Sequence, residues 1–226
     1  MNGLKTVGLL TIGQSPRTDM TADLRPIFDG KLHYIEAGAL DGLSLSQVLM
    51  MAPQPGDHFL VTRMADNTMV HIAAGHLTDL MQNQITRLEQ SGVSAILILC
   101  TEGFAPFHCS IPVIYPNDVL KAQVPAAASH GHIGVILPDR GQVSDFAAAW
   151  ESVVPQVDAT FGSPYADDGS LKDAAKYFAG SDVDLIVLDC MGYTAAMAEM
   201  ISETSGKPVF LAKLLAAEFL TAQITA

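Results

Sequence analysis

Two cysteines occupy matching positions in two similar segments of this 226-residue chain. Residues 93–100 read VSAILILC and residues 183–190 read VDLIVLDC, so each segment is an apolar run that ends in a cysteine, Cys100 or Cys190. A free thiol has an ordinary pKa of about 8.5, close enough to neutrality for the thiolate to act as a base and the thiol as an acid. The matched pair therefore predicts acid–base chemistry in which one thiol works on each face of a small molecule.

Packing offers a second interpretation of these cysteines. Free cysteine is among the most buried residue types, so both could be small fillers of an apolar core. Packing alone does not require the same residue at the ends of two equivalent strands, which favours the functional interpretation. Cys109 has no counterpart in the repeat, and we interpret it as a packing residue.

The elements that must position the thiols follow from the hydrophobic pattern. Short apolar runs alternate with longer amphipathic stretches, which is typical of α/β folds with parallel strands. In such sheets ligands bind beyond the carboxyl ends of the strands, where both cysteines are placed by this pattern. Each cysteine also precedes a predicted helix start, where backbone N–H groups favour a thiolate and a bound carboxylate.

The same pattern predicts individual elements. Ser15 is predicted to cap a helix whose first residue is Pro16. Two strands separated by a tight turn form a predicted hairpin insertion in the first half of the chain. The predicted strands are residues 6–12, 58–64, 69–73, 95–99, 132–137, 157–161, 185–189 and 209–211, and the predicted helices are about 76–90, 142–153, 170–179 and 214–221.

A second internal echo supports duplication. A strand that contains Gly8 opens the first half, and a similar strand that contains Gly134 opens the second. We therefore predict two pseudo-symmetric lobes with mainly parallel sheets, the first formed by residues 1–110 plus 206–226 and the second by residues 111–205, with the active site between them. Residues 112–125 are the predicted crossing from one lobe to the other.

Bulk composition narrows the function classes. Hydrophobic residues make up 49% and charged residues 16%, as expected for a folded domain with a large core. A net charge of −12 argues against nucleic acid or an anionic membrane as the main partner. The sequence predicts no signal peptide, no membrane span and no disulfide framework, so we expect a cytoplasmic protein with free thiols; it leaves the oligomeric state open, including a homo-oligomer.

Ser15 and Arg17 are the first of several weaker site candidates. They follow the first strand, at the edge where the cysteines are expected, and Arg17 could bind a substrate carboxylate with two parallel hydrogen bonds. In the alternative interpretation, Ser15 only caps a helix and the side chain of Arg17 is solvated.

Residues next to the cysteines are also candidates for substrate binding. Thr101 and Thr194 carry hydroxyl groups that could donate to a carboxylate, although local capping is an equal alternative, and Tyr193 belongs to the same segment. The carboxylate of Glu102 adjoins Cys100 and would hinder thiolate formation unless it faces away or orients a proton donor. Asn67 is placed at the tip of the hairpin, where it either covers the site or forms an ordinary turn.

The carboxylate of Asp189 would likewise hinder thiolate formation at Cys190, because the two residues are adjacent.

The seven histidines show no metal-ligand spacing, and no glycine-rich loop matches a nucleotide signature. We therefore predict a site without metal or cofactor.

Three segments resemble the AroM family, within the aspartate/glutamate racemase superfamily that also holds hydantoin racemases, maleate isomerases and arylmalonate decarboxylases. They are residues 10–13 (LTIG), 53–57 (PQPGD) and 187–193 (VLDCMGY). The resemblance implies an aspartate/glutamate racemase-like fold of two α/β lobes. It also implies that Cys100 and Cys190 work without pyridoxal phosphate or metal, one thiolate removing the proton alpha to a carboxylate and the other thiol returning a proton to the opposite face.

This chain departs from the amino-acid racemases beside both cysteines. Thr101-Glu102 stands where Asn-Thr is common, and Asp189 stands where a glycine is common. The substrate of the amino-acid racemases therefore cannot be assigned to this chain. We predict a cofactor-independent racemase or isomerase that acts on a small carboxylate. The alternatives are an isomerase or decarboxylase that uses Cys190 alone and a non-catalytic, regulatory carboxylate-binding protein. A dinucleotide or metal enzyme is a more distant alternative.

Overall fold

The computed structural model describes residues 3–226 and divides the chain into two compact units. Within the described residues, the first unit runs to Pro116 and includes Ala216–Ala226, and the second unit is Asn117–Leu215. The first boundary lies inside the predicted crossing at 112–125. The second unit extends beyond the predicted limit at residue 205, because the strand Val209–Leu211 pairs within its sheet.

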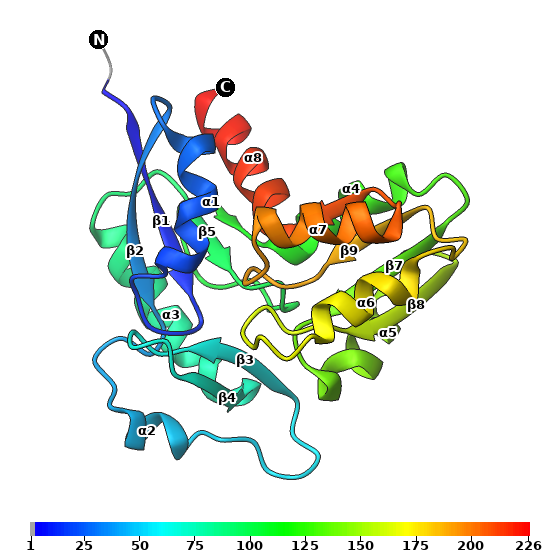
Figure 1. The fold of residues 1–226 in the computed structure, drawn as a ribbon. Coiled ribbons are helices and arrows are strands. Elements are labelled where there is room, and N and C mark those ends of the chain that lie inside the picture. The colour runs from blue at the N-terminus through cyan, green and yellow to red at the C-terminus, as the bar shows by residue number, and fades with distance from the viewer. Residues whose placement is uncertain (1–2) are drawn as a thin grey trace. The chain divides into compact units, whose positions relative to one another are not determined.

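The first unit contains a parallel four-stranded sheet and a separate antiparallel hairpin (Figure 1). The strand order in the sheet is β2-β1-β5-β6, and the hairpin joins β3 to β4 as predicted. The bounds of these elements are β1 Lys5–Thr11, β2 Leu32–Gly38, β3 Phe59–Arg63, β4 Met69–Ala73, β5 Ile96–Leu99, β6 Val113–Ile114, α1 Thr18–Phe28, α2 Leu45–Leu49 and α3 Leu77–Gln90.

The second unit contains a second parallel sheet, with strand order β10-β9-β7-β8. Two helices cross the unit boundaries, since α4 begins at Pro116 and most of α8 belongs to the first unit. The bounds are β7 His132–Leu137, β8 Gln156–Phe161, β9 Leu185–Leu188, β10 Val209–Leu211, α4 Pro116–Ala127, α5 Val143–Glu151, α6 Ser170–Phe178, α7 Ala195–Ser205 and α8 Ala212–Thr225. No described helix is both long and apolar enough to cross a membrane.

The two sheets have the same topology, which supports the predicted duplication. Order β2-β1-β5-β6 in the first corresponds to β8-β7-β9-β10 in the second. Gly8 of β1 pairs with Ile96 of β5, and Gly134 of β7 pairs with Ile186 of β9. A cysteine follows four residues after each of these isoleucines, so the two thiols stand at the same register of equivalent sheets.

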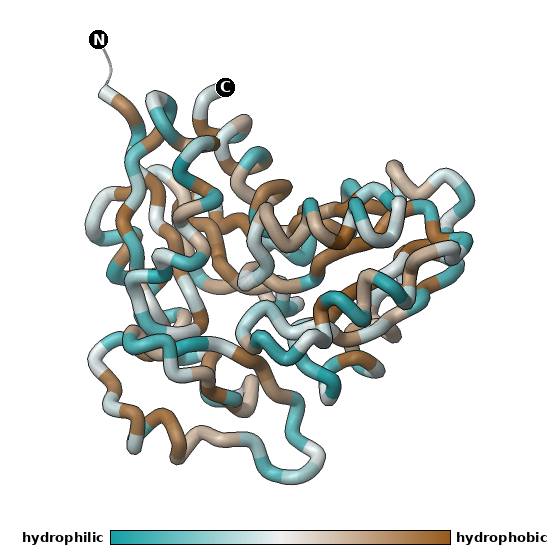
Figure 2. Tube along the Cα trace, in the orientation of Figure 1, coloured by the Kyte–Doolittle hydropathy of each residue, from teal (hydrophilic) through white to brown (hydrophobic). Residues whose placement is uncertain are grey.

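The paired glycines let a helix pack closely on the central strand of each sheet. A Cβ added to Gly8 would lie 3.0 Å from a methyl group of Leu88 on α3, and one added to Gly134 would lie 2.6 Å from the ring of Phe178 on α6. Hydrophobic residues make up most of these central strands (Figure 2), as expected for a parallel sheet that is buried on both faces. The helix before each cysteine strand is thereby held against the sheet.

The predicted cap at Ser15 is wrong. Helix α1 begins at Thr18, and its N-cap residue is Arg17, which makes no side-chain cap. The hydroxyl and backbone N–H of Ser15 instead both donate to the carboxylate of Asp41, at 2.7 Å each. The sequence prediction also omitted β2, β6, α2 and α4 and gave no bounds for α7, because short or mixed patterns are weak signals on their own.

Candidate functional site

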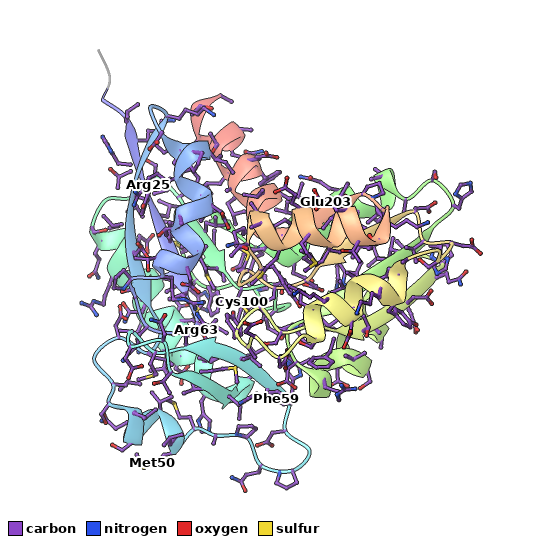
Figure 3. All side chains as sticks on the ribbon, in the orientation of Figure 1. Arg25, Met50, Phe59, Arg63, Cys100 and Glu203 are labelled. Carbon is purple, nitrogen blue, oxygen red and sulfur yellow. The ribbon has the colours of Figure 1, made fainter. Side chains whose placement is uncertain are left out.

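Cys100 lies at the carboxyl end of β5 and is partly exposed (Figure 3). Its Sγ accepts a hydrogen bond from the backbone N–H of Glu102 at 3.5 Å. The predicted helix start after Cys100 is wrong, because residues 101–112 form an irregular segment that contains Pro106 and Pro112. An N–H that donates to sulfur stabilises the thiolate more than the thiol, so this turn replaces the expected helix terminus.

Cys190 has the equivalent environment in the second unit. It is partly exposed after β9, and its Sγ accepts a hydrogen bond from the N–H of Gly192 at 3.4 Å. Here a helix does follow, because α7 begins at Ala195 and Thr194 caps it by accepting from the N–H of Met197. Each sulfur therefore accepts a hydrogen bond from the backbone N–H of the residue two positions later. The same geometry occurs after both of the equivalent strands, β5 and β9.

Asp189 is directed away from the neighbouring sulfur. Successive side chains of a strand point to opposite faces of the sheet, and Cys190 packs with the face of Ile186 and Leu188. On the other face the Asp189 carboxylate, 5% exposed, accepts a hydrogen bond from the indole N–H of Trp150 at 2.7 Å. This hydrogen bond joins the end of β9 to α5.

Tyr193 is part of the core. Its side chain is fully buried, and its hydroxyl donates to the carbonyl of Gly162 at 2.8 Å. Burial, followed by the negative charges of Cys190 and Tyr165, raises the pKa of Tyr193 well above its ordinary value. The predicted contact of Tyr193 with substrate does not fit this position, because the side chain has no exposed surface to offer.

Replacing Tyr193 with phenylalanine should lower stability at neutral pH by about 1–3 kcal/mol, since the buried carbonyl of Gly162 loses its donor. The raised pKa stabilises the folded state fully below about pH 10, and this contribution is lost as the pH rises through the folded pKa. The variant should therefore lose less stability between pH 9 and 11 than the parent does. Urea unfolding across that range measures both effects; equal alkaline slopes would contradict the assignment.

Tyr165 is a site residue that the sequence did not indicate. It follows β8, and its hydroxyl lies 3.5 Å from the Sγ of Cys190. Gly192 makes this approach feasible, because a Cβ at that position would lie 2.4 Å from the Tyr165 hydroxyl. The glycine that follows Cys190 was the available signal, but its neighbour in space is 27 residues away in the chain.

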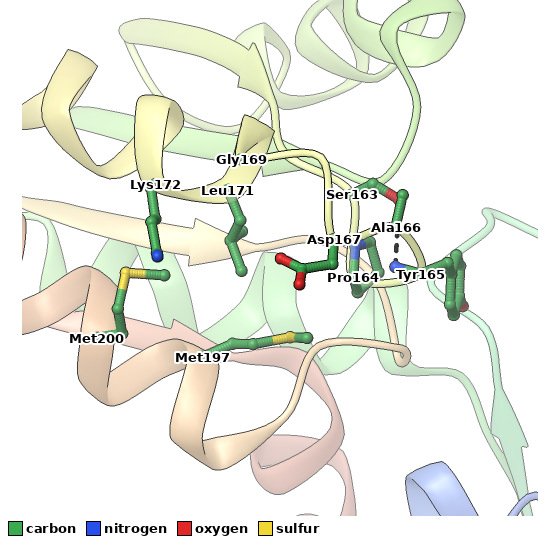
Figure 4. Close-up of a pocket in the computed structure, with 10 residues that line it drawn as sticks. All are labelled: Ser163, Pro164, Tyr165, Ala166, Asp167, Gly169, Leu171, Lys172, Met197 and Met200. Atoms are coloured by element: carbon green, nitrogen blue, oxygen red, sulfur yellow. Dashed lines mark hydrogen bonds between the residues drawn. The ribbon is translucent and has the colours of Figure 1, made fainter.

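A pocket of about 350 Å³ lies in the second unit and has Tyr165 in its wall (Figure 4). The thioethers of Met197 and Met200 and the side chain of Leu171 make much of its lining apolar, with Asp167 and Lys172 as charged groups. Tyr165 therefore contacts Cys190 and also lines a pocket large enough for part of a small ligand.

Glu102 is held by the hairpin insertion. Its carboxylate lies 2.9 Å from Nε2 of His58, the residue before β3. The insertion is thus connected directly to the segment that donates to Cys100. Thr101 is buried, and Asn67 forms a tight turn at the exposed hairpin tip with a φ of 68°, so the turn interpretation fits its geometry.

Arg17 is buried rather than solvated. Its guanidinium, 2% exposed, donates Nε and Nη2 to the two carboxylate oxygens of Asp19 at 2.8 and 2.7 Å. Burial opposes ionisation of Asp19, but the hydrogen bond and charge of Arg17, with the charge of Arg63, keep the pKa of Asp19 below its ordinary value. A substrate carboxylate would have to replace Asp19 to use this two-point contact.

The segment 10–13 and the residue after it join the hairpin to the sheet. A Cβ on Gly13 would lie 2.4 Å from the carbonyl of Arg63, so only glycine allows this approach. Gln14 donates its backbone N–H to the same carbonyl and its side-chain amide to the carbonyls of Leu40 and Leu43. Among residues 3–226, no group of three or more histidine, cysteine or acidic side chains is placed to hold a metal ion.

Several solved structures share this fold at low sequence identity. A glutamate racemase from Bacillus anthracis is 15% identical with a TM-score of 0.63, over 97% of this chain and 81% of that chain. A maleate isomerase from Pseudomonas putida S16 is 14% identical with a TM-score of 0.63, over 98% and 93%. An arylmalonate decarboxylase is 14% identical with a TM-score of 0.60, over 98% and 92%. The fold is therefore that of the aspartate/glutamate racemase superfamily.

Comparison by sequence also identifies a family. The model of the AroM protein family matches residues 7–223. None of the curated proteins matches the chain at a significant level.

Proposed function

Because the chain belongs to the AroM family, with a racemase-like fold, we propose that it is a cofactor-independent racemase or isomerase of a small carboxylate. The observation that carries this proposal is the equivalence of Cys100 and Cys190. Each follows the same strand of a duplicated sheet, is partly exposed, and accepts a backbone N–H from the residue two positions onward. In this proposal the two thiols serve one substrate molecule.

The proposed reaction is a proton exchange at the carbon alpha to the carboxylate. One thiolate takes the proton, forming an S–H bond, and the electron pair of the C–H bond moves into the carboxylate as an enediolate. The thiol of the other cysteine then gives its proton to the opposite face of that carbon and becomes the thiolate. The N–H groups of Glu102 and Gly192 stabilise whichever sulfur carries the charge.

Comparisons with neighbours support a small carboxylate but do not select one. The named structures are a glutamate racemase, a maleate isomerase and an arylmalonate decarboxylase, and at 14–15% identity they share the fold alone. Two of the residues beside the cysteines make contacts within this protein: Glu102 with His58, and Asp189 with Trp150. We therefore leave the group on the alpha carbon unspecified.

Solvent exchange tests the function even while the substrate is unidentified. The purified protein in D₂O should replace the alpha hydrogen of at least one member of a panel of α-amino, α-hydroxy and α-aryl carboxylates by deuterium, observed by proton NMR. The protein with both Cys100 and Cys190 replaced by alanine is the control. A carboxylate that raises the melting temperature but never exchanges would instead indicate a binding protein.

A second candidate uses Cys190 alone as an acid or nucleophile. The contact of the Tyr165 hydroxyl with the Cys190 sulfur favours it, because this phenol gives Cys190 a proton-donating neighbour of its own. This candidate predicts that turnover survives replacement of Cys100 and is lost when Cys190 is replaced.

A further inference from the structure

We propose that Tyr165 is the positioning residue of Cys190: its phenol donates a hydrogen bond to the thiolate and keeps that sulfur charged and oriented at neutral pH. The inference rests on the proposed function for its catalytic meaning, but the contact itself can be tested on the protein without substrate. It adds to the two thiols a residue from a third segment, the loop after β8.

The direction of the hydrogen bond follows from the protonation state of sulfur. When Cys190 is a thiol, either the S–H or the phenol O–H can donate across the 3.5 Å contact. When Cys190 is a thiolate it has no proton, so Tyr165 must donate. The contact therefore gains strength when sulfur becomes charged, and together with the N–H of Gly192 it gives the thiolate two donors.

The loop that carries Tyr165 is fixed at both ends. At its start, the carbonyl of Gly162 accepts from Tyr193, three residues after Cys190. Inside the loop, Ser163 Oγ accepts from the N–H of Tyr165 at 3.1 Å, and the N–H of Ser163 donates to Ser170 Oγ at 3.0 Å. The loop that carries the phenol is thus held by Ser170, in the first turn of α6, and by Tyr193 of the cysteine segment.

Gly192 reserves the space that the phenol fills. A Cβ at residue 192 would lie 2.4 Å from the hydroxyl oxygen and 2.6 Å from Cζ of Tyr165. Alanine at residue 192 would displace the ring of Tyr165, while the backbone N–H of residue 192 would still be available to the sulfur of Cys190. The two substitutions Tyr165→Phe and Gly192→Ala therefore remove the same hydrogen bond by different means.

The test is the pH dependence of alkylation at each cysteine. The protein without ligand is treated with iodoacetamide between pH 5.5 and 10, and the rate at Cys190 is followed by mass spectrometry of its peptide. Tyr165→Phe and Gly192→Ala should each move the rise of the Cys190 rate to higher pH and slow alkylation at pH 7 by about three- to tenfold. Rates at Cys100 should not change, which gives an internal reference.

Matched variants separate this effect from a general disturbance. Tyr177→Phe changes an exposed tyrosine of α6, and Gly75→Ala adds a methyl group where no other atom lies within 4 Å, so neither should alter the Cys190 profile. An unchanged Cys190 profile in Tyr165→Phe would overturn the proposal. Because no substrate is used, that result would leave the proposed function standing, while absent solvent exchange with a shifted profile would contradict the function alone.

Discussion

Alanine at Cys190 or at Cys100 is expected to reduce interconversion of the substrate's mirror forms by about 10²–10⁴-fold, the usual contribution of a positioned general acid or base. The physical reason is that two-base chemistry needs an acceptor on one face and a donor on the other, so neither thiol can replace its partner. Both sulfurs are partly exposed at strand ends, and the fold should tolerate each change with little loss of stability.

Cys109→Ala provides the matched control, since this third cysteine is also partly exposed but has no place in the duplicated strands. Interconversion is measured by optical rotation or chiral chromatography, and folding by thermal unfolding. Full activity of the Cys100→Ala protein would reject the two-thiol mechanism and leave the Cys190 mechanism as the explanation. Full activity of both single variants would remove the thiols from the chemistry altogether.

Alanine at Gly134 is expected to destabilise the second unit by about 1–3 kcal/mol, the usual cost of overpacking a dense core. The added Cβ would lie 2.6 Å from the ring of Phe178, which is fully buried and cannot withdraw as a unit from β7. Gly8→Ala is the matched variant in the first unit. Its Cβ would come closest to the terminal methyl groups of Leu88, at 3.0 and 3.1 Å, which are the flexible end of a side chain, so we expect a smaller cost.

Urea unfolding at a fixed neutral pH measures these free energies. A smaller side chain at Phe178, as in Phe178→Leu, should recover part of the loss in the double variant with Gly134→Ala, giving a favourable coupling of about 0.5–3 kcal/mol. The packing described for α3 and α6 would be contradicted if the effects of Gly134→Ala and Phe178→Leu on the free energy of unfolding were additive. An equal loss of stability in Gly8→Ala and Gly134→Ala would also contradict it.

The duplication was readable from the sequence because strands buried on both faces leave continuous apolar runs. The two runs that end in Cys100 and Cys190, and the glycines at residues 8 and 134, predicted equivalent strands, and the sheets have the same order and register. The hairpin insertion was equally clear, because polar turn residues separate its two apolar strands.

The surroundings of the thiols were less predictable. Ser15 was expected to cap a helix, and Arg17 either to bind a substrate carboxylate or to be solvated, but Ser15 donates to Asp41 and Arg17 to Asp19. Tyr193 was expected at the substrate and is buried, since its hydroxyl binds a carbonyl 31 residues earlier. In each case the deciding partner is distant in sequence or competes with a local pattern, which periodicity does not report.

By itself, then, the sequence determined the α/β class, the repeat and the two strand-end thiols, because hydrophobic period and residue identity are local properties. Only the tertiary structure decided that Asp189 turns to Trp150, that Glu102 meets His58, and that Tyr165 reaches the Cys190 sulfur. These are contacts between side chains of separate elements. Their formation depends on strand parity, on the space left by Gly192 and on the pairing of buried polar groups, and none of these is written in a single segment of the chain.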